Sequence, residues 1–244
     1  MPKNDEPEWE RVLSSAAHLQ RLFPDAVLVG GTAAAKHVGH RLSRDADHVL
    51  TDLRSRFDDV LAELESVAGW KTARVNRPVQ ILGSLDGIET GIRQLIRSEP
   101  LDTIEIEHDG QKITLPTAAE MLRIKGALIL KRNATRDYID FAALSERLGD
   151  VGTSPALRRF DELYPQPNGE SALQQLQIQL ANPLPYDLDA TNLAEYKSLN
   201  PRWHDWNQVK EACAHSAMVF FDRLAGERSN NIEVTKKIDR GYER

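Results

Sequence analysis

The chain has 244 residues, of which 41% are hydrophobic and 28% charged, and its formal net charge is −6. This composition is typical of a folded globular protein and excludes a chain that is disordered over most of its length. Proteins that coat DNA without regard to its sequence are usually basic, so the acidic balance argues against that class as well.

Neither a membrane span nor a secretory signal is visible in the sequence. No apolar run approaches the roughly 18 residues that a transmembrane helix needs. The first residues, Met-Pro-Lys-Asn-Asp-Glu-Pro-Glu, contain no apolar segment of the kind found in secretory signals. Cys213 is the single cysteine, so no internal disulfide can form. We therefore expect a cytoplasmic protein with one large domain or two small ones.

The first half of the chain shows both helical and strand patterns. Apolar residues at helical spacing predict helices over residues 8–22 and 54–67. Short apolar or alternating runs predict strands, which are 26–29, 45–50, several within 70–95, and a hairpin of 104–107 with 112–115. Gly30-Gly31 reads as a tight turn after the first strand, and Thr32 as the cap of a short alanine-rich helix.

Helical patterns dominate after residue 115. Thr117 and Glu120 form a capping box that opens a helix reaching about Arg132. Thr135 is expected to cap the next helix, which would end near Leu148. Further helices are expected over 170–181 and 205–225. The pattern therefore divides the chain into an α/β half, 1–115, and a helical half, 116–244.

The most informative stretch of the sequence joins Gly30-Gly31 to Asp45 and Asp47. Residues i and i+2 of a strand face the same side, so the two aspartates project together. Two carboxylates on one face repel unless a cation such as Mg²⁺ neutralises them. A Gly-Gly turn before a helix lets backbone N–H groups approach a phosphate. The combination predicts metal-dependent phosphoryl or nucleotidyl transfer.

This stretch resembles the DNA-polymerase-β-type nucleotidyltransferases, and more specifically the AbiEii/AbiGii-type toxin nucleotidyltransferases. Members of that family typically show G-G-T-A and then H-R-x-S-x-D-x-D, which here read Gly30-Gly31-Thr32-Ala33 and His40-Arg41-Leu42-Ser43-Arg44-Asp45-Ala46-Asp47. They also carry a helical Lys and then R-D-x-x-D, which here are Lys125 and Arg136-Asp137-Tyr138-Ile139-Asp140. The resemblance covers about residues 26–148.

A third metal-binding carboxylate is expected on a later strand, because such folds usually need one. Glu89 is our choice, since alternation puts Glu89, Gly91 and Arg93 on one face of a strand. The family more often has Asp at this position, so Glu105 and Glu107 stay as alternatives, with Asp86 as a weaker one.

Lys125 lies on an apolar helix stripe, where an unpaired ammonium is costly. The resemblance implies that it binds NTP phosphates together with Gly30, Gly31 and Thr32, and it places Arg136, Asp137 and Asp140 around the same site. Two alternatives stay open for Lys125, a side chain that snorkels to solvent and an ion pair with Asp137 or Asp140. The aspartates have an alternative of their own, because an acid in a first helical turn is favourable by itself.

Several weaker features favour structural interpretations. His40 and His48 flank the aspartate pair, but a hydrogen-bonded structural role is expected for both. The segment Pro201-Arg202-Trp203-His204-Asp205-Trp206 reads as a helix entry packed by its tryptophans rather than a base-stacking surface. Cys213 reads as core. The basic residues of the middle of the chain form either one patch or separate solvated faces, and they are Arg93, Arg97, Arg123, Lys125, Lys131, Arg132 and Arg136.

The resemblance implies an α+β fold, with a minimal nucleotidyltransferase core of a mixed sheet flanked by helices, a helical C-terminal domain, and the NTP between them. It further implies an enzyme in which Asp45, Asp47 and Glu89 hold Mg²⁺ or Mn²⁺ and a nucleotide is moved from an NTP to RNA, tRNA in first place. The chain would be the toxin of a toxin–antitoxin pair, with an antitoxin protein as partner. The alternatives are transfer to a protein or to a small molecule such as an antibiotic, and a non-catalytic interaction module of the same fold.

Overall fold

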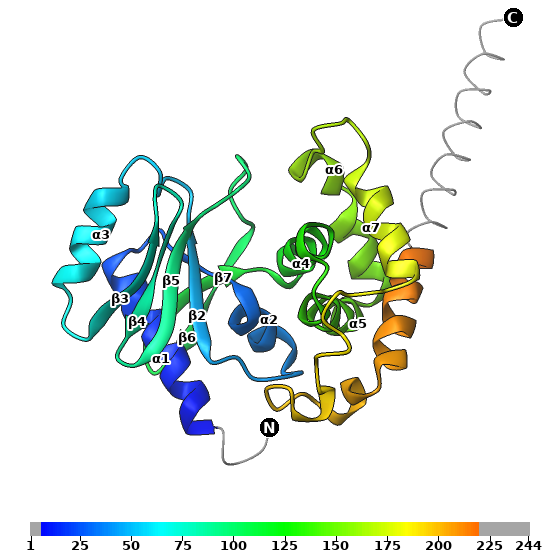
Figure 1. Ribbon diagram of the computed structural model, residues 1–244, viewed down its shortest axis with the longest axis horizontal. Coiled ribbons are helices and arrows are strands. Elements are labelled where there is room, and N and C mark those ends of the chain that lie inside the picture. Colours follow the sequence, from blue (N-terminus) through cyan, green and yellow to red (C-terminus); the bar gives the residue numbers. More distant parts are fainter. Residues whose placement is uncertain (1–5, 220–244) are drawn as a thin grey trace, which may run out of the picture.

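The computed structural model describes residues 6–219, and its strands form two sheets (Figure 1). The larger sheet has the order β1-β2-β5-β4-β3, and the smaller one pairs β6 with β7. The strands are β1 Val27–Leu28, β2 Asp45–Leu50, β3 Trp70–Asn76, β4 Gln80–Leu85, β5 Ile88–Gln94, β6 Thr103–His108 and β7 Gln111–Pro116. The strand over 45–50 and the hairpin about Asp109-Gly110 are confirmed.

The helices account for most of the chain outside the sheets. They are α1 Glu6–Leu22, α2 Gly30–Val38, α3 Phe57–Ser66, α4 Ala118–Arg132, α5 Thr135–Leu157, α6 Phe160–Leu163 and α7 Ala172–Ala181, followed by two short 3₁₀ turns, η1 Leu193–Glu195 and η2 Pro201–His204. Residues 206–219 are also helical, and the rest of the helix expected over 205–225 lies outside the described residues. None of the described helices is long and apolar enough to cross a membrane.

The large sheet is mixed. Its one parallel pair, β2 with β5, carries the carboxylates that the sequence singled out. β2 runs parallel to β5, while β1–β2, β4–β5 and β3–β4 are antiparallel. The register sets Asp45 beside Glu89 and Asp47 beside Gly91. Burial alternates along β2, where Ala46 and His48 are buried and the two aspartates are not. The aspartates and Glu89 therefore share the more open face of the sheet.

Two apolar clusters hold the fold together. The first lies between the buried face of the large sheet, α3 and the C-terminal end of α1, with Phe57 and Leu64 among its fully packed members. The second is larger and joins the start of α1 to α2, the β6–β7 hairpin and the helices α4, α5 and α7. Because Leu115 and Met121 belong to this same cluster, one core runs across residue 115, and a domain boundary there stays a prediction.

Two helix starts differ from the prediction, in which Thr32 and Thr135 cap their own helices. α2 begins at Gly30 itself, so Thr32 lies inside the helix, and its hydroxyl donates to the carbonyl of Asp45. The N-cap of α5 is Ala134. There Thr135 donates from both its backbone N and its hydroxyl to Asp187 Oδ1, each at 2.7 Å, so a distant carboxylate does the capping. Thr117 does cap α4, accepting from the backbone N of Glu120 at 3.1 Å.

The helical part of the chain otherwise follows the sequence pattern. α5 is interrupted at Gly149, whose φ of 62° breaks the helix directly after the predicted end at Leu148. Trp203 is buried at the short turn before the last described helix, and Cys213 is buried on that helix. Figure 1 shows the helices α4 to α7 gathered beside the sheet, with α2 between the two. The fold is α+β, as expected from the sequence.

Candidate active site

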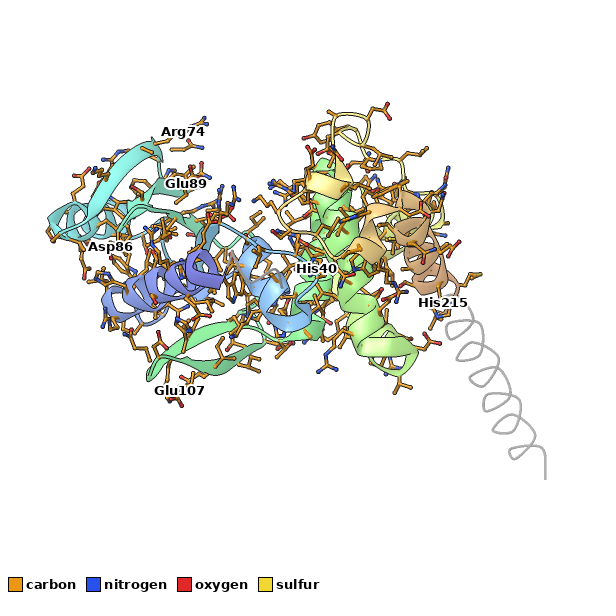
Figure 2. The ribbon with its side chains drawn as sticks, turned by 90° about the horizontal axis from the view of Figure 1, so that it is seen from below. His40, Arg74, Asp86, Glu89, Glu107 and His215 are labelled. Atoms are coloured by element: carbon orange, nitrogen blue, oxygen red, sulfur yellow. The ribbon has the colours of Figure 1, made fainter. Side chains whose placement is uncertain are left out.

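Three carboxylates lie on one face of the large sheet at the start of β2 and β5. Asp45 and Asp47 come from β2, and Glu89 is exposed on β5 in register with Asp45. The alternatives for the third carboxylate lie elsewhere. Glu105 and Glu107 belong to β6, in the separate two-stranded sheet, and Figure 2 shows Glu107 well away from Glu89.

Glu105 is also occupied, because Lys112 Nζ donates to it at 2.7 Å. Asp86 lies in the turn before β5 and pairs with His18 at 3.0 Å. The placement therefore favours Glu89 over each alternative, and its role as a metal ligand stays a prediction.

Basic and hydroxyl groups already surround the aspartate pair. Arg93 Nη2 lies 3.6 Å from Asp47 Oδ1, and Lys197 Nζ lies 3.9 Å from Asp45 Oδ1. The Ser43 hydroxyl donates to Asp45 Oδ1 at 2.6 Å. These groups offset the repulsion that two carboxylates on one face would otherwise feel.

The two aspartates differ in their electrostatic surroundings. Burial alone would raise the pKa of Asp45, but the Ser43 hydroxyl and Lys197 outweigh it and the pKa lies below its ordinary value. Burial also raises the pKa of Asp47, and here the nearby charge of Asp45 adds to it, while Arg93 and Arg136 lower it without cancelling the rise. Ionising both aspartates is therefore unfavourable in the free protein. A divalent cation bound between them would remove this unfavourable repulsion.

The two glycines at the start of α2 differ in how closely other groups approach them. A Cβ built on Gly31 would lie 2.5 Å from Arg41 Nη2 and 2.9 Å from the Ser43 hydroxyl. Gly30 has a φ of +76°, and a Cβ there would sit 3.7 Å from Asp47 Oδ2. The first N–H groups of a helix have no partner within it, so this start is a ready anion site beside the aspartates.

A buried ionic network stands behind this helix start, centred on Asp140 of α5. Arg41 donates from Nε and Nη2 to the two oxygens of Asp140 at 2.7 and 2.9 Å. Lys125 Nζ lies 2.7 Å from Asp140 Oδ2, and His40 Nε2 lies 2.7 Å from Oδ1. Burial alone would raise the pKa of Asp140, but Arg41 and Lys125 hold it well below its ordinary value.

Asp137 forms the second half of the network. Arg132 donates to its two oxygens at 2.5 and 2.7 Å, and Lys125 Nζ lies 3.4 Å from Oδ1. Both Asp137 and Asp140 are fully buried, and Lys125 is 1% exposed. Of the interpretations open for Lys125, the structure places its ammonium in the ion pairs with the aspartates, and contact with phosphate stays a prediction.

Arg136 is the exposed member of this region. It begins the R-D-x-x-D segment on the first turn of α5, and its charge acts on both Asp47 and Tyr196. The structure therefore separates the motif into one arginine that faces the carboxylates and two aspartates that lie inside the protein. Arg97 and Arg123 belong to another site, where both bind the buried Glu120. The basic residues of the middle of the chain do not form one patch.

The segment after η1 reaches back toward the sheet face that carries Asp45, Asp47 and Glu89, which we call the active face. The sequence did not predict this contact. Lys197 and Ser198 have φ of 44° and 51°, which turns the chain sharply. The carbonyl of Lys197 accepts from Leu42 N at 2.9 Å, and Asn200 N donates to His40 O at 2.7 Å. Nothing in the sequence indicated that Lys197 lies near Asp45, because its position depends on this turn. Arg41 lay within the family motif but was given no role.

The donor set fits a hard divalent cation. Asp45, Asp47 and Glu89 offer carboxylate oxygens from adjacent strands, and Mg²⁺ is commonly held by one or two carboxylates together with substrate phosphates. In the described part of the chain, the single tight group of three acidic or histidine ligands is Glu10, His108 and Asp109, whose ligand atoms lie within 4.8 Å of one another. The carboxylates of the active face are spaced more widely, which leaves room for substrate oxygens.

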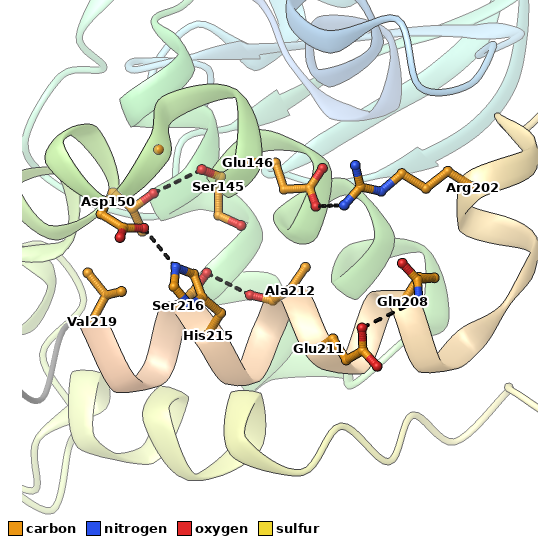
Figure 3. A pocket seen from close by; sticks show the side chains of 12 residues that line it. Ser145, Glu146, Asp150, Arg202, Gln208, Glu211, Ala212, His215, Ser216 and Val219 are labelled. Atoms are coloured by element: carbon orange, nitrogen blue, oxygen red, sulfur yellow. Dashed lines mark hydrogen bonds and ion pairs between the residues drawn. The ribbon is translucent and has the colours of Figure 1, made fainter.

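A cavity of about 500 Å³ lies apart from these residues, between α5 and the last described helix (Figure 3). Its charged groups are largely paired with one another. His215 Nε2 lies 2.8 Å from Asp150, and Arg202 pairs with Glu146. None of the three carboxylates lines this cavity, so we do not assign the reaction to it.

Two solved structures with a similar fold are described as a nucleotidyltransferase-like protein and a putative nucleotidyltransferase. An antigenic nucleotidyltransferase-like protein from Paracoccidioides brasiliensis matches with a TM-score of 0.51 and 16% identity, over 82% of this chain and 98% of its own. A putative nucleotidyltransferase from H. pylori matches with a TM-score of 0.50 and 14% identity, over 93% and 98%. At these identities the likenesses show that the chain shares the fold of these proteins.

The family is shown by a sequence match over most of the chain. The model described as "Nucleotidyl transferase AbiEii toxin, Type IV TA system" matches residues 11–215, and the chain therefore belongs to the AbiEii nucleotidyltransferase toxin family. A curated relative, the "Heme uptake protein MmpL11" of Mycobacterium tuberculosis, is 27% identical over 231 residues, covering 86% of this chain. The chain spans 22% of the length of that relative.

Proposed function

We propose that this protein transfers a nucleotidyl group from an NTP to the terminal hydroxyl of an RNA, with tRNA as the acceptor, in a reaction that depends on Mg²⁺ or Mn²⁺. It would act in the cytoplasm as the toxin of a toxin–antitoxin pair, neutralised by an antitoxin protein. One observation carries the reaction: Asp45, Asp47 and Glu89 share one sheet face beside the glycine start of α2. The family supports the toxin role.

Each group of residues has a distinct task in this reaction. The free N–H groups of Gly30, Gly31 and Thr32 bind the triphosphate. Asp45, Asp47 and Glu89 hold the metal, which when bound stabilises the attacking and leaving oxygens of an in-line displacement. The acceptor hydroxyl gives up its proton, its oxygen bonds to the α-phosphorus, and the bond to pyrophosphate breaks.

The basic residues around the carboxylates divide into direct and indirect contributors. Arg136 is exposed and acts on Asp47, so we assign it to the phosphates. Lys125, Asp137 and Asp140 are buried together, and we assign them a positioning role. Through Asp140 they fix Arg41 against Gly31, and through Asp137 they fix Arg132 at the end of α4.

The test is incubation of the protein with total RNA, Mg²⁺ and each labelled NTP in turn, with Asp45→Asn as the matched variant. We expect one NTP to label RNA of tRNA size, and no label with the variant or with a chelator. Label on a protein or a small molecule instead of RNA would overturn the proposed acceptor. Full labelling by Asp45→Asn would overturn the assignment of the carboxylates.

A further inference from the structure

A second cavity, of about 680 Å³, opens beside the carboxylates. Asp45 and Glu89 line it, whereas Asp47 and the glycines at the start of α2 do not. It is therefore continuous with one flank of the active face, and α2 occupies the other. Its floor is formed by Gly87 and Ile88, where β5 begins.

Three cations from three separate segments line this cavity. Arg11 comes from α1, Arg44 from the loop before β2, and Lys197 from the segment after η1. The guanidinium of Arg11 lies against the turn before β5, donating to the carbonyl of Asp86 at 3.4 Å. Residues this far apart in sequence meet here because α1 packs against β2 and β5, while the segment after η1 contacts the loop before β2 through the bond from Leu42 N to the carbonyl of Lys197.

The cations have only weak partners of their own. Arg44 Nε lies 3.3 Å from Glu8 Oε1, and the two side chains are 65% and 43% exposed. Exposed ion pairs contribute little, about 0–1 kcal/mol, so this one opens readily for an incoming anion. Once a divalent cation offsets the charges of Asp45 and Glu89, three positive side chains face one remaining carboxylate, Glu8, and the net charge of the cavity is positive.

We propose that this cavity binds the 3′-terminal nucleotide of the acceptor, with Arg11 and Arg44 contacting its phosphates. This inference rests on the proposed function. In-line displacement puts the attacking and leaving oxygens on opposite sides of the phosphorus, so the acceptor must enter from the flank that α2 does not occupy. Arginine suits phosphate because its donors match two oxygens at once.

The charge and size of the cavity also define the acceptor. A cationic acceptor such as an amino sugar would be repelled by three basic side chains, and an uncharged hydroxyl compound would gain nothing from them. A volume in the range of ordinary ligand pockets, about 300–1,000 Å³, accommodates a single nucleotide rather than a duplex. The acceptor would therefore present a single-stranded end.

The test compares Arg11→Gln, Arg44→Gln and the double variant with Arg21→Gln, an exposed arginine on α1 that lies about 15 Å further along the helix. Steady-state labelling gives KM for RNA and for NTP separately. Fluorescence anisotropy with a single-stranded oligoribonucleotide bearing a free 3′ hydroxyl gives binding without NTP. We expect the double variant to raise KM for RNA and the oligonucleotide Kd by about tenfold or more. KM for NTP should change by less than about twofold, and Arg21→Gln should match the wild type.

Two outcomes separate this inference from the proposed function. If RNA is labelled but the double variant keeps the wild-type KM for RNA, the cavity assignment is overturned and the function stands. If no RNA is labelled, the function fails, and the anisotropy measurement still decides the cavity. Weaker oligonucleotide binding by the double variant then supports it, and unchanged binding overturns it.

Discussion

Lys197 stands where a metal ion would compete with it. Its ammonium lies 3.9 Å from Asp45 Oδ1, at a residue that sequence alone did not single out. A cation so placed reduces the repulsion between Asp45 and Asp47 in the free protein. A divalent ion that binds Asp45 would have to displace it. If the carboxylates bind Mg²⁺ as proposed, Lys197 would help to set the Mg²⁺ concentration that the free protein needs.

Removing this ammonium should tighten the metal site. We expect Lys197→Met to lower the half-saturating Mg²⁺ concentration by roughly two- to fivefold, which corresponds to the value of about 0.5–1 kcal/mol for a partly exposed ion pair. A Mg²⁺ titration of the free protein by calorimetry measures this shift. Lys210→Met, on the helical segment 206–219, is the matched control. A higher Mg²⁺ requirement in Lys197→Met would show that the lysine assists loading instead.

His48 on β2 should make the free energy of unfolding depend on pH. It is fully buried on the face of β2 opposite the aspartates, and burial lowers its pKa from 6.5 to about 4. The unfolded chain takes up a proton near 6.5, so between these values the unfolded state binds more protons. The free energy of unfolding should therefore fall as the pH falls from about 6.5 to 4, by up to about 3 kcal/mol.

Melting curves of the wild type and His48→Gln between pH 7 and 4 test this expectation. His37 and His40 are present in both proteins, so the difference between the two curves isolates His48. We expect the difference in melting temperature between the wild type and His48→Gln to shrink progressively as the pH falls over this range. Two curves that fall in parallel would show that His48 does not titrate on unfolding.

At the scale of elements, the start of α2 leaves little room for a side chain on Gly31. Arg41 cannot move away from Gly31 freely, because the residue is 3% exposed and its guanidinium is held by both oxygens of Asp140. Gly31→Ala should therefore overpack this contact, at about 1–3 kcal/mol of stability. Because Arg41 and Ser43 adjoin the aspartate pair, nucleotide incorporation should fall further than stability explains.

Thermal melting and single-turnover labelling, both on Gly31→Ala, separate these effects. A variant with wild-type melting and wild-type labelling would mean that the helix start tolerates a side chain. A variant that melts earlier but labels at the wild-type rate below its melting temperature would limit the role of Gly31 to packing.

Helices and strands could be predicted from the sequence where the apolar residues recur at a clear helical or strand spacing. The alternation of β2, the cap of α4 by Thr117 and the turn at Asp109-Gly110 each depend on neighbours within a few residues. The Glu120 half of the predicted capping box does not form, because its carboxylate binds Arg97 and Arg123. The starts of α2 and α5 were not readable, because their partners are distant in sequence. Asp187 caps α5 from 52 residues away, and the Thr32 hydroxyl binds the carbonyl of Asp45 rather than its own helix start.

The same distinction applies to the candidate site. Asp45 and Asp47 share a strand, so their common orientation followed from spacing alone. The register that sets Glu89 beside Asp45, and the burial of Lys125 against Asp140, depend on pairing between distant segments. Lys125 illustrates this best. Its place on an apolar helix stripe predicted that the ammonium needs a partner, but it did not show whether that partner is a phosphate or an aspartate.

At the scale of the whole molecule, the buried network joins three segments of the chain. Arg41 precedes β2, Lys125 lies on α4, and Asp140 lies on α5. Removing one partner from a buried ion pair typically costs about 3–5 kcal/mol. Because Arg41 and His40 would still bind Asp140, we expect Lys125→Met to destabilise the free protein by about 2 kcal/mol, below that range.

Lys131→Met is the matched control for Lys125→Met, because Lys131 lies on the same helix and is exposed. Melting curves measure the stability of both, and calorimetric binding of a non-hydrolysable NTP with Mg²⁺ measures affinity. Unchanged affinity in Lys125→Met would rule out a direct contact with phosphate. Unchanged stability with weaker NTP binding would contradict the positioning role.

The order of the strands has a consequence for how the protein becomes active during its synthesis. β2 finds its parallel partner only after β3 and β4 have been made, and Lys197 follows about a hundred residues later. Pairings between distant segments form slowly, because the intervening chain must first be closed into a loop. A partly synthesised chain would thus carry Asp45 and Asp47 without the strand and the lysine that complete the active face. The proposed activity would therefore appear only after the segment that carries Lys197 has left the ribosome.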